Sequence, residues 1–517
     1  MFAAPLQPRF MVMAQTISEL LARGTDDAVA IAAPERASLT FAGLRAHATA
    51  TVAALNAAGI GRGDRVAIVL PNGPEMASAF VAIGTGATTA PLNPAYRADE
   101  FEFYLSDLQA KALVVEAGAD SPALGVAAKL GVPVLRLVPR RDGPAGLFGF
   151  EGAGSGKAAQ GGVAHADDVA LVLHTSGTTS RPKIVPLSQR NVTASARNIA
   201  AMLSLTAADR CLNIMPLFHI HGLIAAVLSS LYAGGTVSCT PGFNALKFFQ
   251  WLDDVKPSWY TAVPTMHQAI LSRAERNPES VARARLRFIR SSSASLPPQV
   301  MLELEKVFGA PVIESYGMTE AAHQMASNPL PPRARKPGSV GVAAGPEVAI
   351  MSEDGHILAR GETGEIVIRG ENVTKGYEAN PKANESAFTN GWFRTGDQGL
   401  LDAEGYLSIT GRLKEIINRG GEKVSPREVD EVLLDHPAVA QALTFAMPHA
   451  KLGEEVAAAI VLKEGASATE QDIRAFVSRH LADFKVPRKV VVLAEIPKGA
   501  TGKLQRIGLA GKLGLGA

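Results

Sequence analysis

The sequence predicts an α/β fold, with a large multi-sheet α/β domain followed by a small α+β domain at the C-terminus. With 517 residues, the chain exceeds what one hydrophobic core normally serves, so two or more domains are expected. From Thr16 to about Val138, amphipathic helices alternate with short apolar strands, which is typical of mostly parallel sheets covered by helices. The pattern changes near residue 345 to short strands and glycine turns, and changes again near Gly411.

The first part of the chain predicts regular βα units. Helices are expected over 44–55 and 74–84, and strands over 65–70 and 112–116. The segment 139–162 is rich in Gly, Ala and charged residues and is predicted to be a loop. It contains Gly154-Ser155-Gly156-Lys157, but Glu151 stands where a phosphate-binding Walker A loop needs its first glycine, and Ala158 follows the lysine. We therefore reject a Walker A loop.

The middle of the chain places polar loops after apolar strands. The expected strands are 169–173, 211–215, 234–239, 259–263, 286–290 and 311–314. Several of them run directly into stretches rich in Ser, Thr, His or Gly. Ligands of open α/β sheets bind beyond the carboxyl ends of the strands, so these loops are the expected site.

The last part of the chain predicts two smaller units. A β-rich subdomain is expected at about 345–411, which completes a large domain of residues 1–411. Residues 412–517 are expected to form the small domain. Its predicted elements are helices over 425–434 and 469–481 and strands over 456–462 and 489–493.

Composition excludes several classes of function. The net charge of +2 gives no reason to expect binding to nucleic acid or to an anionic membrane. Cys211 and Cys239 are the two cysteines, without metal-like spacing, so neither a disulfide framework nor a zinc site is expected. The N-terminus has no sustained apolar core, and no apolar run reaches the ~20 residues of a membrane span. A cytoplasmic location is expected.

One loop has the composition of a polyphosphate site. The strand over 169–173 runs into a loop of hydroxyl side chains and glycine that ends in Pro182-Lys183. Hydroxyls, exposed backbone N–H groups and a cation are the groups that bind polyphosphates. The candidate phosphate ligands are Thr175, Ser176, Gly177, Thr178, Thr179 and Lys183.

Together, the polar loops resemble the motifs of the acyl-adenylate-forming (AMP-binding) enzymes, which include acyl-CoA synthetases, luciferases and nonribosomal adenylation domains. The matching segments are the phosphate loop, Ser315–Glu320 (adenine and magnesium), Thr395-Gly396-Asp397 (ribose), Gly411–Glu415 (hinge) and Pro497–Lys503 (C-terminal lysine loop). They span nearly the whole chain in the order of the family.

Further segments resemble the oxalyl-CoA synthetase branch of that family. They are Ser180-Arg181-Pro182-Lys183, Phe288–Leu296, Lys336–Gly341 and Asn418–Lys423. One residue departs from the family pattern, because Ile184 follows Lys183 where glycine is usual. The turn at Ile184 must therefore avoid positive φ.

The resemblance implies a reaction in two halves with ATP, Mg²⁺ and coenzyme A. A carboxylate attacks the α-phosphorus of ATP to form an acyl-adenylate and diphosphate, and a thiol then displaces AMP. The hydroxyl loop, Lys183 and Thr319 would bind phosphates, and Glu320 would hold Mg²⁺. Tyr316 and the backbone of Ser293, Ala294 and Ser295 would bind adenine, and Asp397 with Arg412 would bind ribose.

The resemblance also implies that the small domain moves during the reaction. Lys503 would stabilise charge between the acyl carboxylate and the α-phosphate, and only while the small domain is closed. A hinge near Lys414 would then swing this domain and bring Gly420 and Gly421 to the channel of the CoA pantetheine.

The acid is expected to be a compact dianion. His219, Ser292, Ser293 and His323 stand where relatives that bind aromatic acids carry apolar or aromatic residues, and His219 is also a catalytic candidate. A buried second carboxylate needs hydrogen bonds of the kind that imidazoles and hydroxyls form. Oxalate is expected first, and malonate or another short diacid second; His221 is expected to be a core residue.

Other functions stay open at this level. A 4-coumarate-type or medium-chain acyl-CoA ligase would use an aromatic or aliphatic acid. A nonribosomal adenylation domain would need a carrier protein, and no Gly-Gly-x-Ser attachment motif is present, so only small-molecule partners are expected. A luciferase-like oxygenase would need an apolar pocket. A non-catalytic nucleotide sensor could keep the loops, although Lys503 and Glu320 argue against it.

Overall fold

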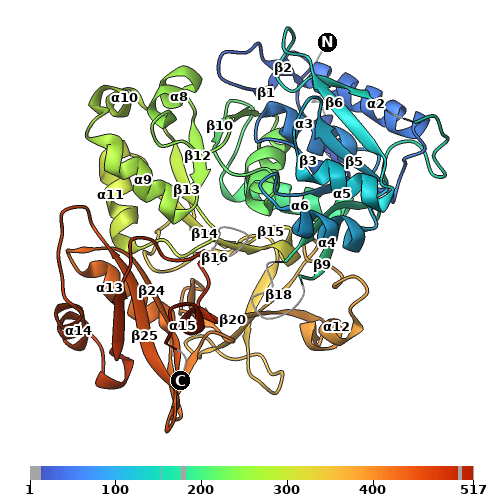
Figure 1. Cartoon of the computed structure of the whole chain (residues 1–517). Coiled ribbons are helices and arrows are strands. Elements are labelled where there is room, and N and C mark those ends of the chain that lie inside the picture. Colours follow the sequence, from blue (N-terminus) through green and yellow to red (C-terminus); the bar gives the residue numbers. More distant parts are fainter. Residues whose placement is uncertain (1–12, 153, 176–181, 499–503, 516–517) are drawn as a thin grey trace, which may run out of the picture.

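The computed structural model describes residues 13–152, 154–175, 182–498 and 504–515. The sheets of the first 340 residues form the upper part of Figure 1, and the C-terminal residues form the lower left part. Within the described residues, no helix combines the length and apolar character that a membrane span requires.

A seven-stranded sheet is built from residues 65–188, in the order β7-β6-β5-β3-β4-β8-β9. Its strands are β3 (Arg65–Val69), β4 (Thr88–Pro91), β5 (Ala112–Glu116), β6 (Val134–Pro139), β7 (Phe148–Glu151), β8 (Val169–His174) and β9 (Ile184–Ser188). The inner pairs are parallel, as expected, and the edge strands β7 and β9 are antiparallel to their neighbours.

Strand β7 lies inside the segment that was predicted to be a loop, so that prediction is wrong for four residues. Leu137 of β6 pairs with Phe150, and the ring of Phe148 packs edge-on against His47 with centroids 4.3 Å apart. The two phenylalanines alternate at strand spacing, but glycine and charged residues surround them in the sequence. Tertiary packing therefore outweighs local composition here.

A nine-stranded sheet carries most of the polar loops, in the order β16-β15-β14-β13-β12-β10-β11-β1-β2. Its strands are β1 (Val29–Ala32), β2 (Leu39–Thr40), β10 (Arg210–Asn213), β11 (Thr236–Cys239), β12 (Trp259–Ala262), β13 (Phe288–Ser291), β14 (Val312–Met318), β15 (His323–Ser327) and β16 (Val342–Ala343). Strands β10, β12, β13 and β14 are parallel, so their carboxyl ends meet at one edge.

Helices cover and separate the two sheets (Figure 1). They are α1 (Ile17–Leu21), α2 (Phe41–Ala57), α3 (Pro74–Gly84), α4 (Ala98–Leu108), α5 (Pro122–Leu130), α6 (Gln189–Met202), η1 (His221–Leu228), α7 (Ser229–Tyr232), α8 (Phe248–Val255), α9 (Pro264–Ala274), α10 (Pro278–Arg283), α11 (Pro298–Phe308) and η2 (Thr319–Ala321). Every residue of α3 is buried, because α3 contacts β4 of one sheet and β11 of the other. The main hydrophobic core therefore runs through both sheets.

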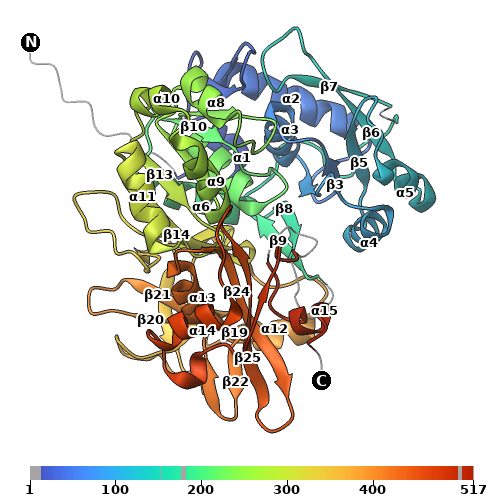
Figure 2. The same cartoon turned by 60° about the vertical axis from the view of Figure 1, so that its left-hand side comes forward.

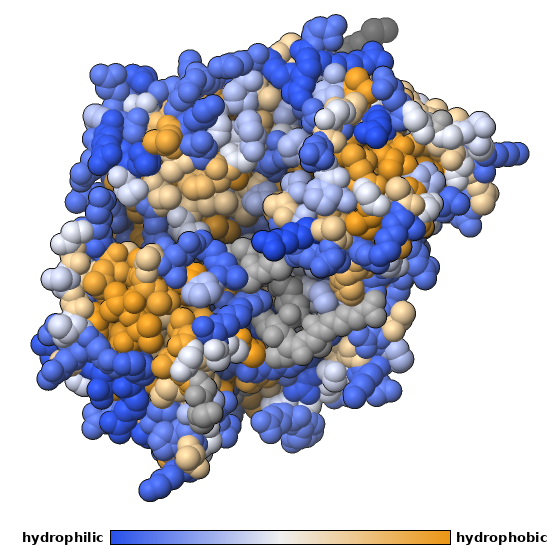
Figure 3. Space-filling model, in the orientation of Figure 1, coloured by the Kyte–Doolittle hydropathy of each residue, from blue (hydrophilic) through white to orange (hydrophobic). Residues whose placement is uncertain are grey.

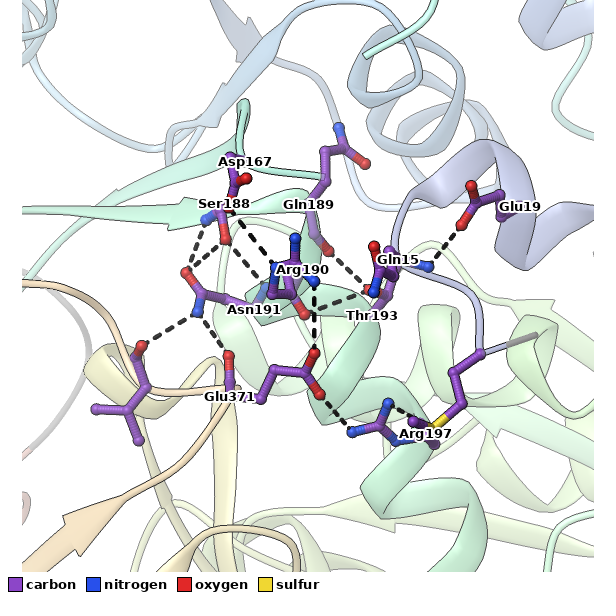
Figure 4. Close-up of polar contacts among 12 residues, drawn as sticks. Gln15, Glu19, Asp167, Ser188, Gln189, Arg190, Asn191, Thr193, Arg197 and Glu371 are labelled. Atoms are coloured by element: carbon purple, nitrogen blue, oxygen red, sulfur yellow. Dashed lines mark hydrogen bonds and ion pairs between the residues drawn. The ribbon is translucent and has the colours of Figure 1, made fainter. Parts of the chain in front are cut away.

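Helix α6 connects the phosphate-loop strands to a distant loop at 371–374 (Figure 4). Ser188 caps the helix by accepting the N–H of Asn191, whose side-chain amide donates to the backbone oxygens of Glu371 and Val373. Arg197 adds an ion pair of 2.7 Å to the Glu371 carboxylate. These contacts fix the loop 371–374 against α6.

Short strands fill the segment from 347 to 412, where a β-rich subdomain was expected. They are β17 (Glu347–Met351), β18 (Gly364–Arg369), β19 (Phe388–Thr389), β20 (Trp392–Leu401) and β21 (Leu407–Arg412), with α12 (Pro381–Ala387) between them. All neighbouring strands in this sheet are antiparallel. The sheet ends at Arg412, next to the expected hinge.

The C-terminal residues have their own sheet and their own hydrophobic clusters. Its elements are β22 (Ile417–Arg419), β23 (Glu422–Val424), α13 (Pro426–Asp435), β24 (Val439–His449), β25 (Gly453–Leu462), α14 (Glu470–Ser478), η3 (Asp483–Lys485), β26 (Lys489–Val492) and α15 (Leu509–Lys512). Strand β24 was not predicted, although it pairs with β25 along its whole length. The domain boundary at 411/412 stays a prediction.

A hollow separates the C-terminal part from the large part on the face shown in Figure 3, and apolar side chains gather on the C-terminal part beside it. Outside the connecting segment, the Gln299 amide of α11 donates to the Asp435 carboxylate of α13 at 2.7 Å across the two parts. Near the connection, the hydroxyl of Ser425 donates to the backbone oxygen of Thr410.

Candidate active site

The base of the phosphate loop is closed by two hydrogen bonds. The backbone N–H of Thr175 donates to the oxygen of Lys183 at 3.0 Å, and the N–H of Lys183 donates to Oγ1 of Thr175 at 3.2 Å. The loop thus leaves the end of β8 and returns as β9. Its candidates Ser176, Gly177, Thr178 and Thr179 lie outside the described residues.

Ile184 behaves as expected. It is the first residue of β9, pairs with His174 and is not among the residues with positive φ. Its side chain is buried against the core of the seven-stranded sheet. The far end of the loop is therefore part of a regular strand and needs no glycine.

Glu320, Tyr377 and Lys183 form a compact group beside this loop. The Tyr377 hydroxyl donates to Oε1 of Glu320 at 2.8 Å, and Nζ of Lys183 lies 4.2 Å from the centre of the Tyr377 ring. Burial raises the pKa of Glu320 and lowers the pKa of Lys183. Tyr377 was missed, because a tyrosine after Lys375-Gly376 has no distinguishing pattern in a single sequence.

The turn that carries Thr319 and Glu320 is held by the loop 371–374. The N–H of Thr374 donates to the backbone oxygen of Glu320 at 2.7 Å, and the side-chain amide of Asn372 donates to the oxygen of Ala321 at 2.8 Å. Thr319 is half-buried at the start of this turn. Helix α6 therefore positions the turn indirectly, since it fixes the same loop.

The same turn has a strained backbone. Ala322 and His323 have φ values of +46° and +98°, which residues with a Cβ rarely adopt. Opposite them, a Cβ on Gly317 would lie 1.9 Å from the backbone oxygen of His323. The glycine thus allows the close approach that turns the imidazole of His323 into the buried interior.

Tyr316, Asp397 and Arg412 lie together, as the resemblance implied for the adenine and ribose contacts. The Tyr316 hydroxyl donates to Oδ2 of Asp397, and Nε of Arg412 donates to Oδ1 at 2.9 Å. Burial and the Asp397 carboxylate raise the pKa of Tyr316. Because β20 and β21 pair Asp397 directly with Arg412, the β-rich sheet sets this geometry.

The expected adenine edge is a loop after β13. Ser293 has a φ of +71°, Ala294 is exposed and Ser295 is half-buried. Glu314 anchors the far end of the loop by accepting the N–H of Leu296 at 2.9 Å. Glu314 was missed by sequence reasoning; burial raises the pKa of this carboxyl to about 7.

The residues expected to contact the acid gather at the ends of β10, β13 and β15. His323 is buried, and its ring centroid lies 5.0 Å from that of His221. His219 is half-buried, and its Nδ1 accepts the N–H of His221 at 3.3 Å, so neutral His219 carries its proton on Nε2. Ser292 differs from the expectation, because its buried hydroxyl donates to the oxygen of Ser315 at 3.0 Å instead of facing an acid.

His221 is fully buried, as expected for a core residue, but it also contacts the site. Its Nδ1 lies 3.0 Å from Oγ of Ser293, and its Nε2 lies 2.6 Å from Oγ1 of Thr261. Burial lowers its pKa well below the usual value, and the nearby His323 and Arg290 act in the same direction. His221 is therefore neutral at physiological pH. It begins η1, a π-helical turn of the kind found often at functional sites.

The predicted hinge and CoA residues lie on the C-terminal side. Lys414 is exposed in the turn after β21, and its charge lowers the pKa of Lys183 in addition to burial. Gly420 and Gly421 form the β22–β23 turn with φ values of +59° and +102°. Figure 2 places this hairpin at the end of the C-terminal part that is farthest from the large part. Lys503 lies outside the described residues.

Comparison with known proteins identifies the family. Residues 19–378 match the AMP-binding enzyme model, and residues 428–503 match the AMP-binding enzyme C-terminal domain. The chain is 49% identical over 454 residues to an oxalate–CoA ligase of Arabidopsis thaliana, covering 87% of this chain and 88% of the relative. It is 43% identical over 470 residues to an oxalate–CoA ligase of Saccharomyces cerevisiae, covering 86% of each.

A solved structure shares the fold. ATP-bound MatB from Rhodopseudomonas palustris matches with a TM-score of 0.86 at 31% identity, covering 97% of this chain and 99% of that chain. The resemblance inferred from the motifs and the predicted fold class are both confirmed. The chain belongs to the AMP-binding enzyme family, and the protein is an AMP-forming CoA ligase.

Proposed function

We propose that the protein is an oxalate–CoA ligase, which converts oxalate, ATP and CoA to oxalyl-CoA, AMP and diphosphate. The observation that carries this proposal is the polar cluster of His219, His323 and Ser293, which stands where an aromatic or fatty acid needs an apolar lining. Imidazole N–H and hydroxyl groups suit a short acid whose second carboxylate is buried with it. The identities to oxalate–CoA ligases support the same assignment.

In the first half-reaction, a carboxylate oxygen of the acid attacks the α-phosphorus of ATP, and the bond to diphosphate breaks. Thr175, the hydroxyl loop, Lys183 and Thr319 neutralise and orient the phosphates. Asp397 accepts hydrogen bonds from the ribose hydroxyls, and Arg412 holds its carboxylate. Tyr316 and the loop of Ser293, Ala294 and Ser295 border the adenine. The protein acts mainly by positioning charge, which is how enzymes speed phosphoryl transfer.

Glu320 fits the role of a magnesium ligand. It is a buried carboxylate with one oxygen oriented by Tyr377, and burial raises its pKa, so a nearby cation stabilises its charged form. The described residues contain no group of three or more potential metal ligands. Mg²⁺ often uses one protein carboxylate together with substrate phosphates and water. When bound, the ion neutralises charge on the phosphates.

In the second half-reaction, the CoA thiolate attacks the acyl carbon, and AMP leaves. Rotation about Lys414 withdraws Lys503 and brings the Gly420–Gly421 turn to the pantetheine. The turn is exposed, and although the Leu452 side chain packs against Gly420, nothing lies within 4 Å of a Cβ on Gly421, so a substrate can approach the backbone there closely. His219 borders the acid at the head of η1 and is the catalytic candidate of the large domain. Free CoA, and not a carrier protein, is the proposed acceptor.

We place the reaction in the cytoplasm, in oxalate degradation. The free thiols of Cys211 and Cys239 suit a reducing compartment. A panel of short acids tests the assignment by CoA-thioester formation. Oxalate should give the highest kcat/KM, above malonate, acetate and 4-coumarate. A preference for malonate would make malonate the assigned substrate. A preference for 4-coumarate or a medium-chain acid would replace the dicarboxylate ligase by a ligase for that acid. If no acid gives a thioester, a nucleotide sensor would be favoured.

A further inference from the structure

Arg290 is a buried cation that has no carboxylate beside it in the described part of the chain. It lies on β13, its side chain is fully buried, and its contacts are neutral acceptors. Nη1 lies 3.3 Å from Nε2 of His221 and 3.4 Å from Oγ1 of Thr261, and Nη2 lies 3.3 Å from Oε1 of Gln324. Burial lowers the pKa of Arg290 to about 9, so it stays charged at neutral pH. Buried charges normally pair with an opposite charge.

The arginine determines which nitrogen of His221 carries the proton. A guanidinium only donates hydrogen bonds, so Nε2 of His221 accepts in its contact with Nη1 of Arg290, and the Thr261 hydroxyl beside it can donate to the same nitrogen. Because His221 is neutral, its proton is then on Nδ1. This N–H donates to Oγ of Ser293 at 3.0 Å.

The hydroxyl of Ser293 is left to donate elsewhere. Its oxygen accepts from His221, and no acceptor for its proton lies among the described residues. The positive φ of Ser293 is maintained by contacts on both sides, because the Ser292 hydroxyl binds the oxygen of Ser315 and the N–H of Leu296 binds Glu314. Such strain persists only where the surroundings enforce it.

We propose that Arg290 and His221 are positioning residues, which fix the Ser293 hydroxyl as a donor to the second carboxylate of the acid, and that the charge of Arg290 selects dicarboxylates over monocarboxylates. The inference rests on the proposed function, since it concerns the same acid. Arg290 does not touch the acid; it acts through His221. The second carboxylate supplies the negative charge that the surroundings of Arg290 lack, and a monocarboxylic acid cannot supply it.

Gln324→Glu tests the charge directly. This substitution keeps the side-chain shape and places a carboxylate 3.3 Å from Nη2 of Arg290, which neutralises the guanidinium within the fold. It also removes the bond from Gln324 Nε2 to the oxygen of Ala344, so Gln324→Met is the control that loses this bond, together with the Oε1 acceptor of Arg290, without adding charge.

We expect Gln324→Glu to raise the KM for oxalate about tenfold or more, to leave the KM for ATP within about twofold, and to reduce the preference for oxalate over glyoxylate, which has one carboxylate. Gln324→Met should change these values much less. The inference is overturned if Gln324→Glu folds, with an unchanged Tm, and affects oxalate no more than Gln324→Met does. If it does not fold, Ser293→Ala decides, because an unchanged oxalate KM in that variant removes the proposed donor.

The wild-type enzyme separates this inference from the proposed function. If malonate is the substrate, the oxalate assignment fails, and the same variants are measured with malonate. If the wild-type enzyme prefers monocarboxylic acids, the role of Arg290 is overturned whatever the variants show. A purely structural Arg290 would lower Tm in Gln324 variants without separating the KM values for acid and ATP.

Discussion

Tyr377→Phe tests the proposed role of Glu320 as a magnesium ligand. The substitution removes the hydroxyl that donates to Glu320 at 2.8 Å and keeps the ring 4.2 Å from the Lys183 ammonium. A hydrogen bond to a charged group contributes about 1.5–3 kcal/mol, which corresponds to about a 10- to 150-fold change in an equilibrium constant. We therefore expect the KM for MgATP to rise by about that factor, with the oxalate KM unchanged.

Tyr377→Leu should weaken MgATP binding further, because it also removes the contact of the ring with Lys183. That contact is expected to contribute about 0.5–2 kcal/mol. The assay is ATP–diphosphate exchange at several Mg²⁺ concentrations. Without its Tyr377 hydrogen bond, Glu320 should have a pKa that is higher still, so the acidic limb of the pH profile should move to higher pH.

Tyr406→Phe is a matched control for this prediction. Tyr406 also has a lysine over its ring, with Lys336 Nζ at 4.3 Å, and its hydroxyl donates to the oxygen of Ala334 at 2.6 Å. Tyr406→Phe should lower the stability of the protein and leave the Mg²⁺ dependence of ATP–diphosphate exchange unchanged. The reasoning is refuted if Tyr377→Phe has the MgATP KM and Mg²⁺ dependence of the wild type, or if both tyrosine variants change them equally.

Three further predictions concern stability and the half-reactions. Because burial raises the pKa of Glu314 from 4.5 to about 7, the folded state holds a proton that the unfolded state loses, so this stabilisation is present below pH 4.5 and disappears as the pH rises through about 7. Glu314→Gln should remove that pH dependence. Relative to the wild type, the free energy of unfolding of the variant should be higher at pH 8 than at pH 4 by up to about 3 kcal/mol. Urea unfolding measures this difference, and a difference that does not change with pH would contradict the prediction. Gly317→Ala should lower both Tm and activity, since its Cβ would meet the backbone oxygen of His323 at 1.9 Å. The control Gly125→Ala, in the open surface of α5, should be neutral or slightly stabilising. Equal melting temperatures for the two variants would contradict this prediction. Lys503→Ala should abolish adenylation and preserve thioester formation from supplied acyl-adenylate, and equal loss of both half-reactions would exclude its proposed role.

The strands that flank the site could be predicted because each is a short apolar run that ends in a polar loop. β8, β12 and β13 all begin and end within two residues of the prediction. β7 and β24 were missed for a different reason. β7 pairs with β6 and β24 pairs with β25, and these pairings join segments of the chain that were not recognised as partners in the sequence. Pairing partners that lie elsewhere in the chain are invisible to local patterns.

The sequence alone was enough to identify the family and to propose the residues that bind the nucleotide. The motifs are contiguous, so a few neighbouring residues such as Thr395-Gly396-Asp397 contain both the turn and the proposed ribose ligand. Local backbone geometry then brings Asp397 opposite Arg412, since they lie on β20 and β21, the two paired strands of one hairpin. Motifs of this kind can be recognised in the sequence, because the residues that form them are neighbours along the chain.

The sequence suggested His219, Ser293 and His323 for the acid, but only the tertiary structure shows which groups surround them. Arg290 and Gln324 come from strands β13 and β15, Ser293 from the loop after β13, and His221 from the π-helical turn η1, and these elements meet only when the nine-stranded sheet is formed. Sequence reasoning assigned His221 to the core and left Arg290 without a role, because the charge of an arginine says nothing about its burial or its partners. Whether a buried cation is paired depends on every element packed around it, and that is a property of the folded chain.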